Sequence, residues 1–164
     1  ERREVSSAAM AALTGILAAT DLETVAALVD KYAFMAEKSK MKPKKAKNIA
    51  PVNETLVSSG DSSLADAKEK RRACNQQTAV FFLCASVMAQ PYDTPGYVPV
   101  ALASISKHSF ERNAPLGVRD MVKKCCAAYK KTHVSDNWEL HKKVFTEEQL
   151  DALDDVVSSP HYYA

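Results

Sequence analysis

The first forty residues of this 164-residue chain alternate apolar and polar positions at helical spacing. A helix is expected from Arg3 to Ala18, and a second from Glu23 to about Lys38, with Asp21 as its N-cap. The apolar side of the first helix consists of Met10, Leu13, Ile16 and Leu17. That of the second consists of Val25, Leu28, Val29, Tyr32 and Met35. Residues 1–38 are therefore predicted to form an antiparallel helical pair.

The helical pattern stops in residues 39–63. Lysines, serines, Pro43, Pro51 and Gly60 dominate there, and apolar residues are isolated. Such a segment buries too little apolar surface to fold by itself. It is predicted to be a long, flexible, lysine-rich insertion between helices.

A third helix is expected from about Ser62 to Gln90, and its second half is apolar on nearly every side, which predicts burial by neighbouring helices. Pro91, Pro95 and Gly96 then break the chain. Two more helices are expected. One runs from about Val98 to His108, and the apolar positions of the other are Val118, Met121, Val122, Cys125 and Tyr129.

The last predicted helix begins at a capping box, in which Thr146 caps the helix and Gln149 reaches back to it. Its apolar positions are Leu150, Leu153 and Val156, and Pro160 ends it. A shorter helical segment is expected around Trp138, whose ring is interpreted as a core aromatic.

These elements predict an all-α fold, without any convincing strand. Helix lengths and proline breaks favour HEAT-like antiparallel helix pairs at the end of a solenoid, covering residues 64–157. The alternative is a four-helix bundle. The composition agrees with a folded helical protein, because 46% of residues are hydrophobic, 26% are charged and only 4 are glycine.

Residues that could support catalysis are scattered. The four histidines have no metal-ligand spacing, and no known nucleophile or phosphate-binding motif occurs, so neither an enzyme, a metal site nor a cofactor is expected. The cysteines Cys74, Cys84, Cys125 and Cys126 lie in apolar helical stretches and are interpreted as buried small side chains in a reducing compartment. The net charge of +2 predicts no direct nucleic-acid partner, and the longest apolar run is too short to cross a membrane.

Within the insertion, Lys42, Lys44, Lys45 and Lys47 fit a simple nuclear-import pattern. A solvated flexible loop explains the same lysines. We expect a nuclear and cytoplasmic location.

Several blocks in the second half of the sequence resemble the C-terminus of the PA200/Blm10 proteasome activator family. They are residues 91–95 (PYDTP), 136–142 (DNWELHK), 145–150 (FTEEQL) and 159–164 (SPHYYA). The similarity covers roughly residues 70–164 and does not extend residue by residue into residues 1–63. It implies the terminal part of a large helical solenoid that caps the 20S core particle, without catalytic activity of its own.

The resemblance also implies a function for the segment that follows the last helix, residues 158–164, which we call the C-terminal tail. Tyr162, Tyr163 and Ala164 fit the hydrophobic–tyrosine–any pattern of proteasome activators. They are expected to enter a pocket between 20S α-subunits and to promote gate opening, independently of ATP and ubiquitin.

A second function implied by the resemblance is recognition of acetylated histones by a bromodomain-like four-helix region. The acetyl-lysine residues would then be sought among Asn48, Asn113, Tyr92 and Tyr97. No motif assigns any of these residues to that role, and all four also fit the interpretation as ordinary loop residues.

Overall fold

The computed structural model describes residues 2–39, 61–111, 114 and 116–157. These residues form seven α-helices and one short 3-10 helix: α1 Arg2–Ala18, α2 Leu22–Lys38, α3 Asp61–Met88, α4 Tyr97–Ser109, α5 Leu116–Ser135, α6 Trp138–His141, η1 Lys142–Val144 and α7 Glu147–Val157. The described part contains no strand, which confirms the all-α prediction. The predicted insertion at 39–63 falls almost wholly outside the described residues, and only its ends, Ser39 and the first turn of α3, can be compared.

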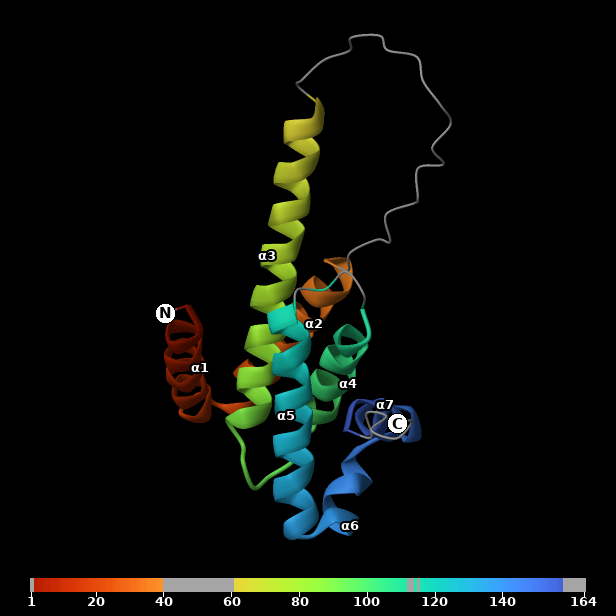
Figure 1. Ribbon diagram of the computed structural model, residues 1–164. Helices are drawn as coiled ribbons and strands as arrows, with labels where there is room; N and C mark the ends of the chain where they lie inside the picture. Colours follow the sequence, from red (N-terminus) through yellow and green to blue (C-terminus); the bar gives the residue numbers. More distant parts are fainter. Residues whose placement is uncertain (1, 40–60, 112–113, 115, 158–164) are drawn as a thin grey trace.

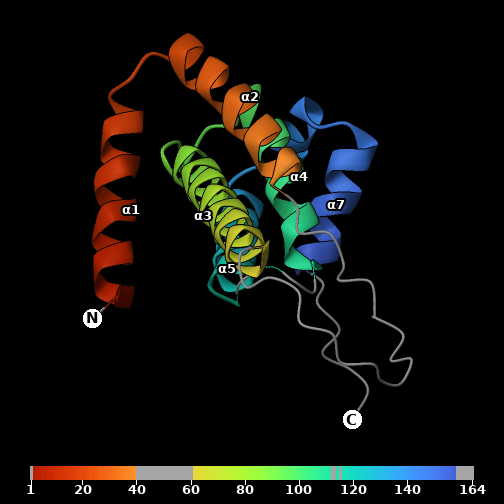
Figure 2. The same ribbon diagram turned by 90° about the horizontal axis from the view of Figure 1, so that it is seen from above.

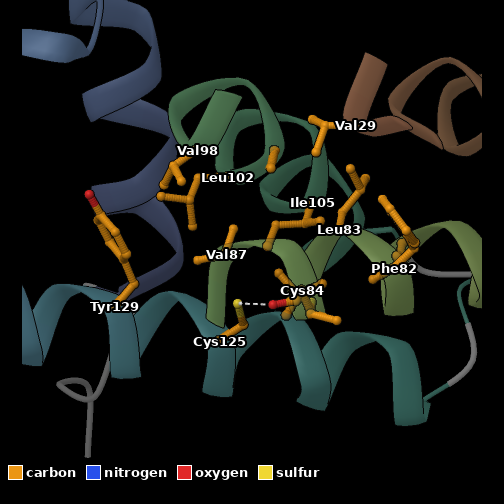
Figure 3. Packing of buried hydrophobic residues seen from close by; sticks show 14 of the residues in the cluster. Val29, Phe82, Leu83, Cys84, Val87, Val98, Leu102, Ile105, Cys125 and Tyr129 are labelled. Carbon is orange, nitrogen blue, oxygen red and sulfur yellow. Dashed lines mark hydrogen bonds between the residues drawn. The ribbon is translucent and has the colours of Figure 1, made fainter. Parts of the chain in front are cut away.

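The second half of α3 forms the centre of the molecule, as its apolar sequence predicts. Leu83, Cys84 and Val87 are almost fully buried, and Phe82 stacks on Tyr32 of α2 with ring centroids 4.0 Å apart. Ile105 and Leu102 of α4 complete the same cluster (Figure 3). Because α3 is enclosed on all sides here, its neighbours have a common core to pack on.

The first half of α3 extends beyond the other helices (Figure 1). Cys74 lies in this half and is exposed, whereas Cys84, Cys125 and Cys126 are buried. The prediction that all four cysteines are buried is therefore wrong for Cys74. Its neighbours Arg71, Asn75 and Gln77 are polar and exposed, so this side of α3 faces solvent.

Helices α1 and α2 pack mainly against other elements and hardly against each other. Helix α1 lies beside α3, while α2 crosses α3 and α4 on another side (Figure 2). Asp21 caps α2 as predicted, accepting a hydrogen bond of 2.8 Å from the Thr24 backbone N–H. Because α1 packs on α3 but hardly on α2, only part of its apolar side is covered: Leu17 is buried, whereas Ile16 is 64% exposed.

Helices α2, α3, α4 and α5 pack on one another around the core, and α7 covers α4 and α5 (Figure 1). The arrangement is consistent with the helical, solenoid-like class predicted from the sequence. It also contains a group of four helices in which α3 and α4 pack on each other and on both α2 and α5, and the bundle alternative depends on this group.

A buried polar cluster joins α3 to the end of α4. The Gln76 amide Nε2 donates a hydrogen bond of 2.6 Å to the Glu111 carboxylate and lies 3.0 Å from His108 Nδ1. His108 Nδ1 is also 3.0 Å from the same carboxylate oxygen. Gln76 and His108 are almost completely buried, so these bonds fix the position of α4 along α3.

The central position of α3 predicts a large loss of stability for Leu83→Ala. Leu83 is fully buried, and its truncation leaves a cavity that rigid neighbours cannot fill. We expect the free energy of unfolding to fall by about 2–5 kcal/mol in chemical denaturation. Leu140→Ala is the matched control, because Leu140 is 56% exposed and should change stability by less than about 0.5 kcal/mol. Equal effects of the two substitutions would contradict the central role of α3.

Candidate functional site

The residues predicted to act directly, Tyr162, Tyr163 and Ala164, lie outside the described residues. What the structure describes is the helix that precedes them. Helix α7 ends at Val157, directly before the C-terminal tail. The candidate site is therefore built from the contacts that hold α7.

The capping box at the start of α7 is present in the structure. The Thr146 backbone N–H donates a hydrogen bond of 2.9 Å to Gln149 Oε1, and the Gln149 backbone N–H lies 3.4 Å from Thr146 Oγ1. The first turn also carries Glu147 and Glu148, whose negative charges favour the positive end of the helix dipole. Both features fix where α7 begins.

The apolar side of α7 faces the core. Leu153 is fully buried, Val156 is nearly so, and the helix contacts α4 and α5. On its outer side, Asp154 pairs with Lys130 of α5. These contacts hold α7 against the bundle up to the point where the C-terminal tail starts.

The segment between α5 and α7 adds an aromatic layer. Trp138 is half-buried and its ring centroid lies 6.2 Å from that of Phe145, which in turn lies 6.1 Å from Tyr129. Lys130 lies over the Trp138 ring at 6.0 Å. This confirms the interpretation of Trp138 as a core aromatic.

A hydrogen-bonded chain connects the turn after α3 to α6. His141 Nε2 lies 3.2 Å from the Asp136 carboxylate, and its Nδ1 lies 2.9 Å from Thr94 Oγ1, which lies 2.7 Å from the Tyr129 hydroxyl. In the neutral ring Nε2–H donates to Asp136, so Thr94 donates to Nδ1 and Tyr129 donates to Thr94. Sequence patterns contain no sign of these hydrogen bonds, because the bonded residues are up to 47 positions apart.

The buried hydroxyl of Tyr129 and the buried thiols of Cys125 and Cys126 hold their protons. Burial raises the pKa of Tyr129 to about 12, although the hydrogen bond with Thr94 opposes the shift. Burial and the neighbouring Cys125 raise the pKa of Cys126 to about 12. The Cys84 thiol and burial raise the pKa of Cys125 well above its ordinary value. A thiol that stays protonated is a poor nucleophile, so these cysteines act as packing groups.

The other predicted site residues are not brought together in the described part of the chain. Lys42, Lys44, Lys45, Lys47, Asn48 and Asn113 lie outside the described residues. Tyr92 is 74% exposed in the turn after α3, whereas Tyr97 is buried at the start of α4. Burial raises the pKa of Tyr97.

Metal-binding and membrane-spanning features were also sought in the residues that the structure describes. No group of three or more histidine, cysteine or acidic side chains there could hold a metal ion. Within the same ranges, no helix combines the length and the apolar character that crossing a membrane requires.

Comparison with known proteins gives consistent matches. Residues 73–164 match the protein family described as "Proteasome activator complex subunit 4-like, C-terminal". The chain is 33% identical over 164 residues to proteasome activator complex subunit 4 of Xenopus laevis and 30% identical over 164 residues to that of Homo sapiens. It is also 32% identical over 109 residues to proteasome activator subunit 4 of Arabidopsis thaliana, covering 63% of this chain and 6% of that protein.

The two vertebrate alignments cover 100% of this chain but only 8% of each relative. The similarity to these relatives thus includes residues 1–63, whereas the resemblance seen in the sequence blocks covered only about residues 70–164.

The capping box predicts a measurable role for Thr146. Thr146→Ala removes the hydroxyl that caps α7, so we expect the free energy of unfolding to fall by about 1 kcal/mol. Hydrogen exchange should accelerate most in the first turn of α7. Ser135→Ala is the matched control, since its hydroxyl bonds to the Lys131 carbonyl at the exposed end of α5. Unchanged exchange in α7 after Thr146→Ala would show that the capping box does not hold the helix.

Proposed function

This chain belongs to the proteasome activator complex subunit 4-like C-terminal family, and on that basis we propose that it docks an activator onto the 20S proteasome through its last three residues. The observation that carries the proposal is the position of α7. This helix is held on the bundle by Leu153, Val156 and the Lys130–Asp154 pair, and the C-terminal tail follows it directly. A fixed helix end gives a short tail a defined starting point.

The length of the tail suits insertion into a pocket. Residues 158–164 follow the last residue of α7. At roughly 3.3 Å for each extended residue, such a segment reaches about 23 Å. A pocket in a partner subunit could therefore receive the last residues while α7 stays packed against α4 and α5.

Each of the last residues has a chemical role in the proposal. The terminal carboxylate of Ala164 pairs with a lysine in a pocket between adjacent α-subunits. Tyr163 buries its ring and donates a hydrogen bond from its hydroxyl, which shifts the loop that controls the gate. Tyr162 adds apolar contact at the pocket mouth, and Pro160 reduces the entropy lost on docking.

Docking through one tail gives modest affinity by itself, so the remainder of the activator supplies most of the contact area. In this proposal the chain has no catalytic activity, and gate opening requires neither ATP nor ubiquitin. We extend the proposal to location: the activator is nuclear and cytoplasmic, with Lys42, Lys44, Lys45 and Lys47 as the import signal.

The proposal predicts that Tyr163→Ala weakens 20S binding. The substitution removes both the buried ring and the hydroxyl, so we expect at least a tenfold loss of affinity for a central aromatic anchor, roughly 1.4 kcal/mol or more. Peptide hydrolysis by 20S particles is measured with full-length activator, together with co-sedimentation.

Tyr163→Phe separates the two contributions, because it keeps the ring and removes only the hydroxyl. It should retain most binding and lose gate opening. Deletion of Ala164 moves the carboxylate and should reduce both. Stimulation by Tyr163→Ala equal to that of the wild type would refute the docking role.

A second candidate function is recognition of acetylated lysine in histones. One observation favours it: α2, α3, α4 and α5 form a packed four-helix group, and its longest connection, residues 39–60, joins the first two helices. In Figure 1, α2 ends and α5 begins at the end of the bundle from which α3 projects. By sequence, Asn48 follows α2 and Asn113 precedes α5, which supports these two over Tyr92 as the acetyl-lysine candidates.

Calorimetry with acetylated and unmodified histone-tail peptides tests this second function. Specific recognition predicts that only the acetylated peptide binds and that Asn113→Ala abolishes the difference. Asn137→Ala is a matched control, because Asn137 caps α6 and lies in the connection after α5. Equal binding of both peptides, or binding of neither, would exclude the acetyl-lysine function.

A further inference from the structure

The long helices of the described chain stack in two layers. Helices α1, α3 and α5 form one layer, in which α3 contacts both α1 and α5. Helices α2, α4 and α7 form the other, in which α4 contacts both α2 and α7. In Figure 1, α1, α3 and α5 run downward, whereas α2 and α4 run upward. The first five helices therefore alternate between the layers, as they do in an array of stacked helix pairs.

This order gives α3 and α5 a partner from the other layer, but it gives α1 none. Helix α2 packs on α3, and α4 packs on α5, so each pair joins two helices that are consecutive in the sequence. Helix α1 contacts α3 within its own layer and hardly contacts α2. The position beside α1 in the second layer is therefore not filled by any of the described residues.

One side of α1 is apolar although it faces solvent. Val5 and Ile16 are 68% and 64% exposed, and Ala9 and Ala12 between them are exposed as well. These four residues follow one another at spacings of three or four positions, so they form one stripe along the helix, which we call the α1 stripe. Leu17, one position after Ile16, lies on another side of the helix and is buried. The α1 stripe is thus a second apolar side, separate from the one that packs on α3.

The two ends of the stack differ in charge. Figure 2 shows α1 and α7 on opposite sides of the molecule. The exposed side of α7 is acidic and consists of Glu147, Glu148, Asp151, Asp154 and Asp155. On α1 and the turn after it, residues 6–20 contain no charged side chain. Because the terminal member of a helical array needs a polar outer face, these charges mark α7 as an end of the stack and α1 as an inner member.

The relatives are long enough to contain the missing partner. The two vertebrate alignments cover the whole of this chain but only 8% of each relative, and the matching family is a C-terminal one. In the pairs α2–α3 and α4–α5, the helix of the second layer comes first in the sequence. By the same order, the partner of α1 is expected directly before α1.

We propose that a helix of the same polypeptide, directly preceding α1 in the sequence, packs on the α1 stripe. It runs antiparallel to α1, as α2 does to α3, and it buries the side chains of Val5 and Ile16. Ala9 and Ala12 are small, so its backbone approaches α1 closely. The proposal rests on the stacking order and on the α1 stripe, so it does not depend on whether the C-terminal tail docks on 20S particles.

Thiol labelling tests the proposal, with Ala12→Cys as the reporter. It is made together with Cys74→Ser, because the other three cysteines are buried. Reaction with a maleimide is followed by mass spectrometry in this chain alone and in a chain extended before α1 by about 45 residues, roughly one helix pair. We expect the reporter thiol to react at least tenfold more slowly in the extended chain. Ala127→Cys, at an exposed position of α5, is the matched control and should react equally fast in both.

A charge placed in the α1 stripe tests the contact itself. Ile16→Glu lies one turn from the reporter and should restore fast labelling in the extended chain. Val134→Glu, at a 52% exposed position of α5, should leave the labelling slow. Both positions are exposed in this chain alone, so neither substitution should change its helical circular dichroism.

Four outcomes would overturn the proposal. Equal labelling rates in this chain and in the extended chain show that the face stays open. Slow labelling of this chain alone, with a dimeric mass by light scattering, assigns the stripe to a second copy. Slow labelling that appears only in the full-length activator assigns it to a more distant segment. Slow labelling only after 20S particles are added assigns it to the proteasome.

Discussion

The burial of the second half of α3 is the constraint on which the rest of the structure depends. Helices α1, α2, α4 and α5 each pack against α3, and the residues from Ala79 to Val87 supply the centre of the core. Apolar surface on nearly every side of one helix can be removed from water only if neighbours surround it. The other helices thus gain their positions from α3, and α7 gains its position from α4 and α5.

Polar groups fix what hydrophobic burial leaves undefined. Apolar contact is non-directional, so it does not by itself set how far one helix slides along another. The Gln76, His108 and Glu111 cluster sets α4 against α3, and the chain from Tyr129 through Thr94 to His141 sets the turn after α3 against α6. Each cluster ties a residue within a long helix, Gln76 of α3 or Tyr129 of α5, to groups at or just beyond a helix end.

The possible functions of the chain are distributed over separate parts of the molecule. The C-terminal tail follows α7 in the sequence, whereas the acetyl-lysine candidates Asn48 and Asn113 belong to the sequence after α2 and before α5. Each part is attached to the same core, so changes in one need not disturb the others.

The local sequence determined where the helices begin and which helix is buried. The positions of Asp21, Thr146 and Gln149 specify helix starts, because a cap acts over three or four residues, and the apolar run in α3 specifies burial for the same local reason. The blocks around Trp138 and Tyr163 were sufficient to indicate the family, since they are continuous in sequence.

Only the tertiary structure decided which helices meet and what they enclose. The exposure of Ile16 and Cys74 and the pairings of Gln76 with Glu111 and of Thr94 with His141 all depend on residues far away in the chain. Spacing along the sequence carries no record of such contacts, because they arise from how α3 is surrounded in three dimensions.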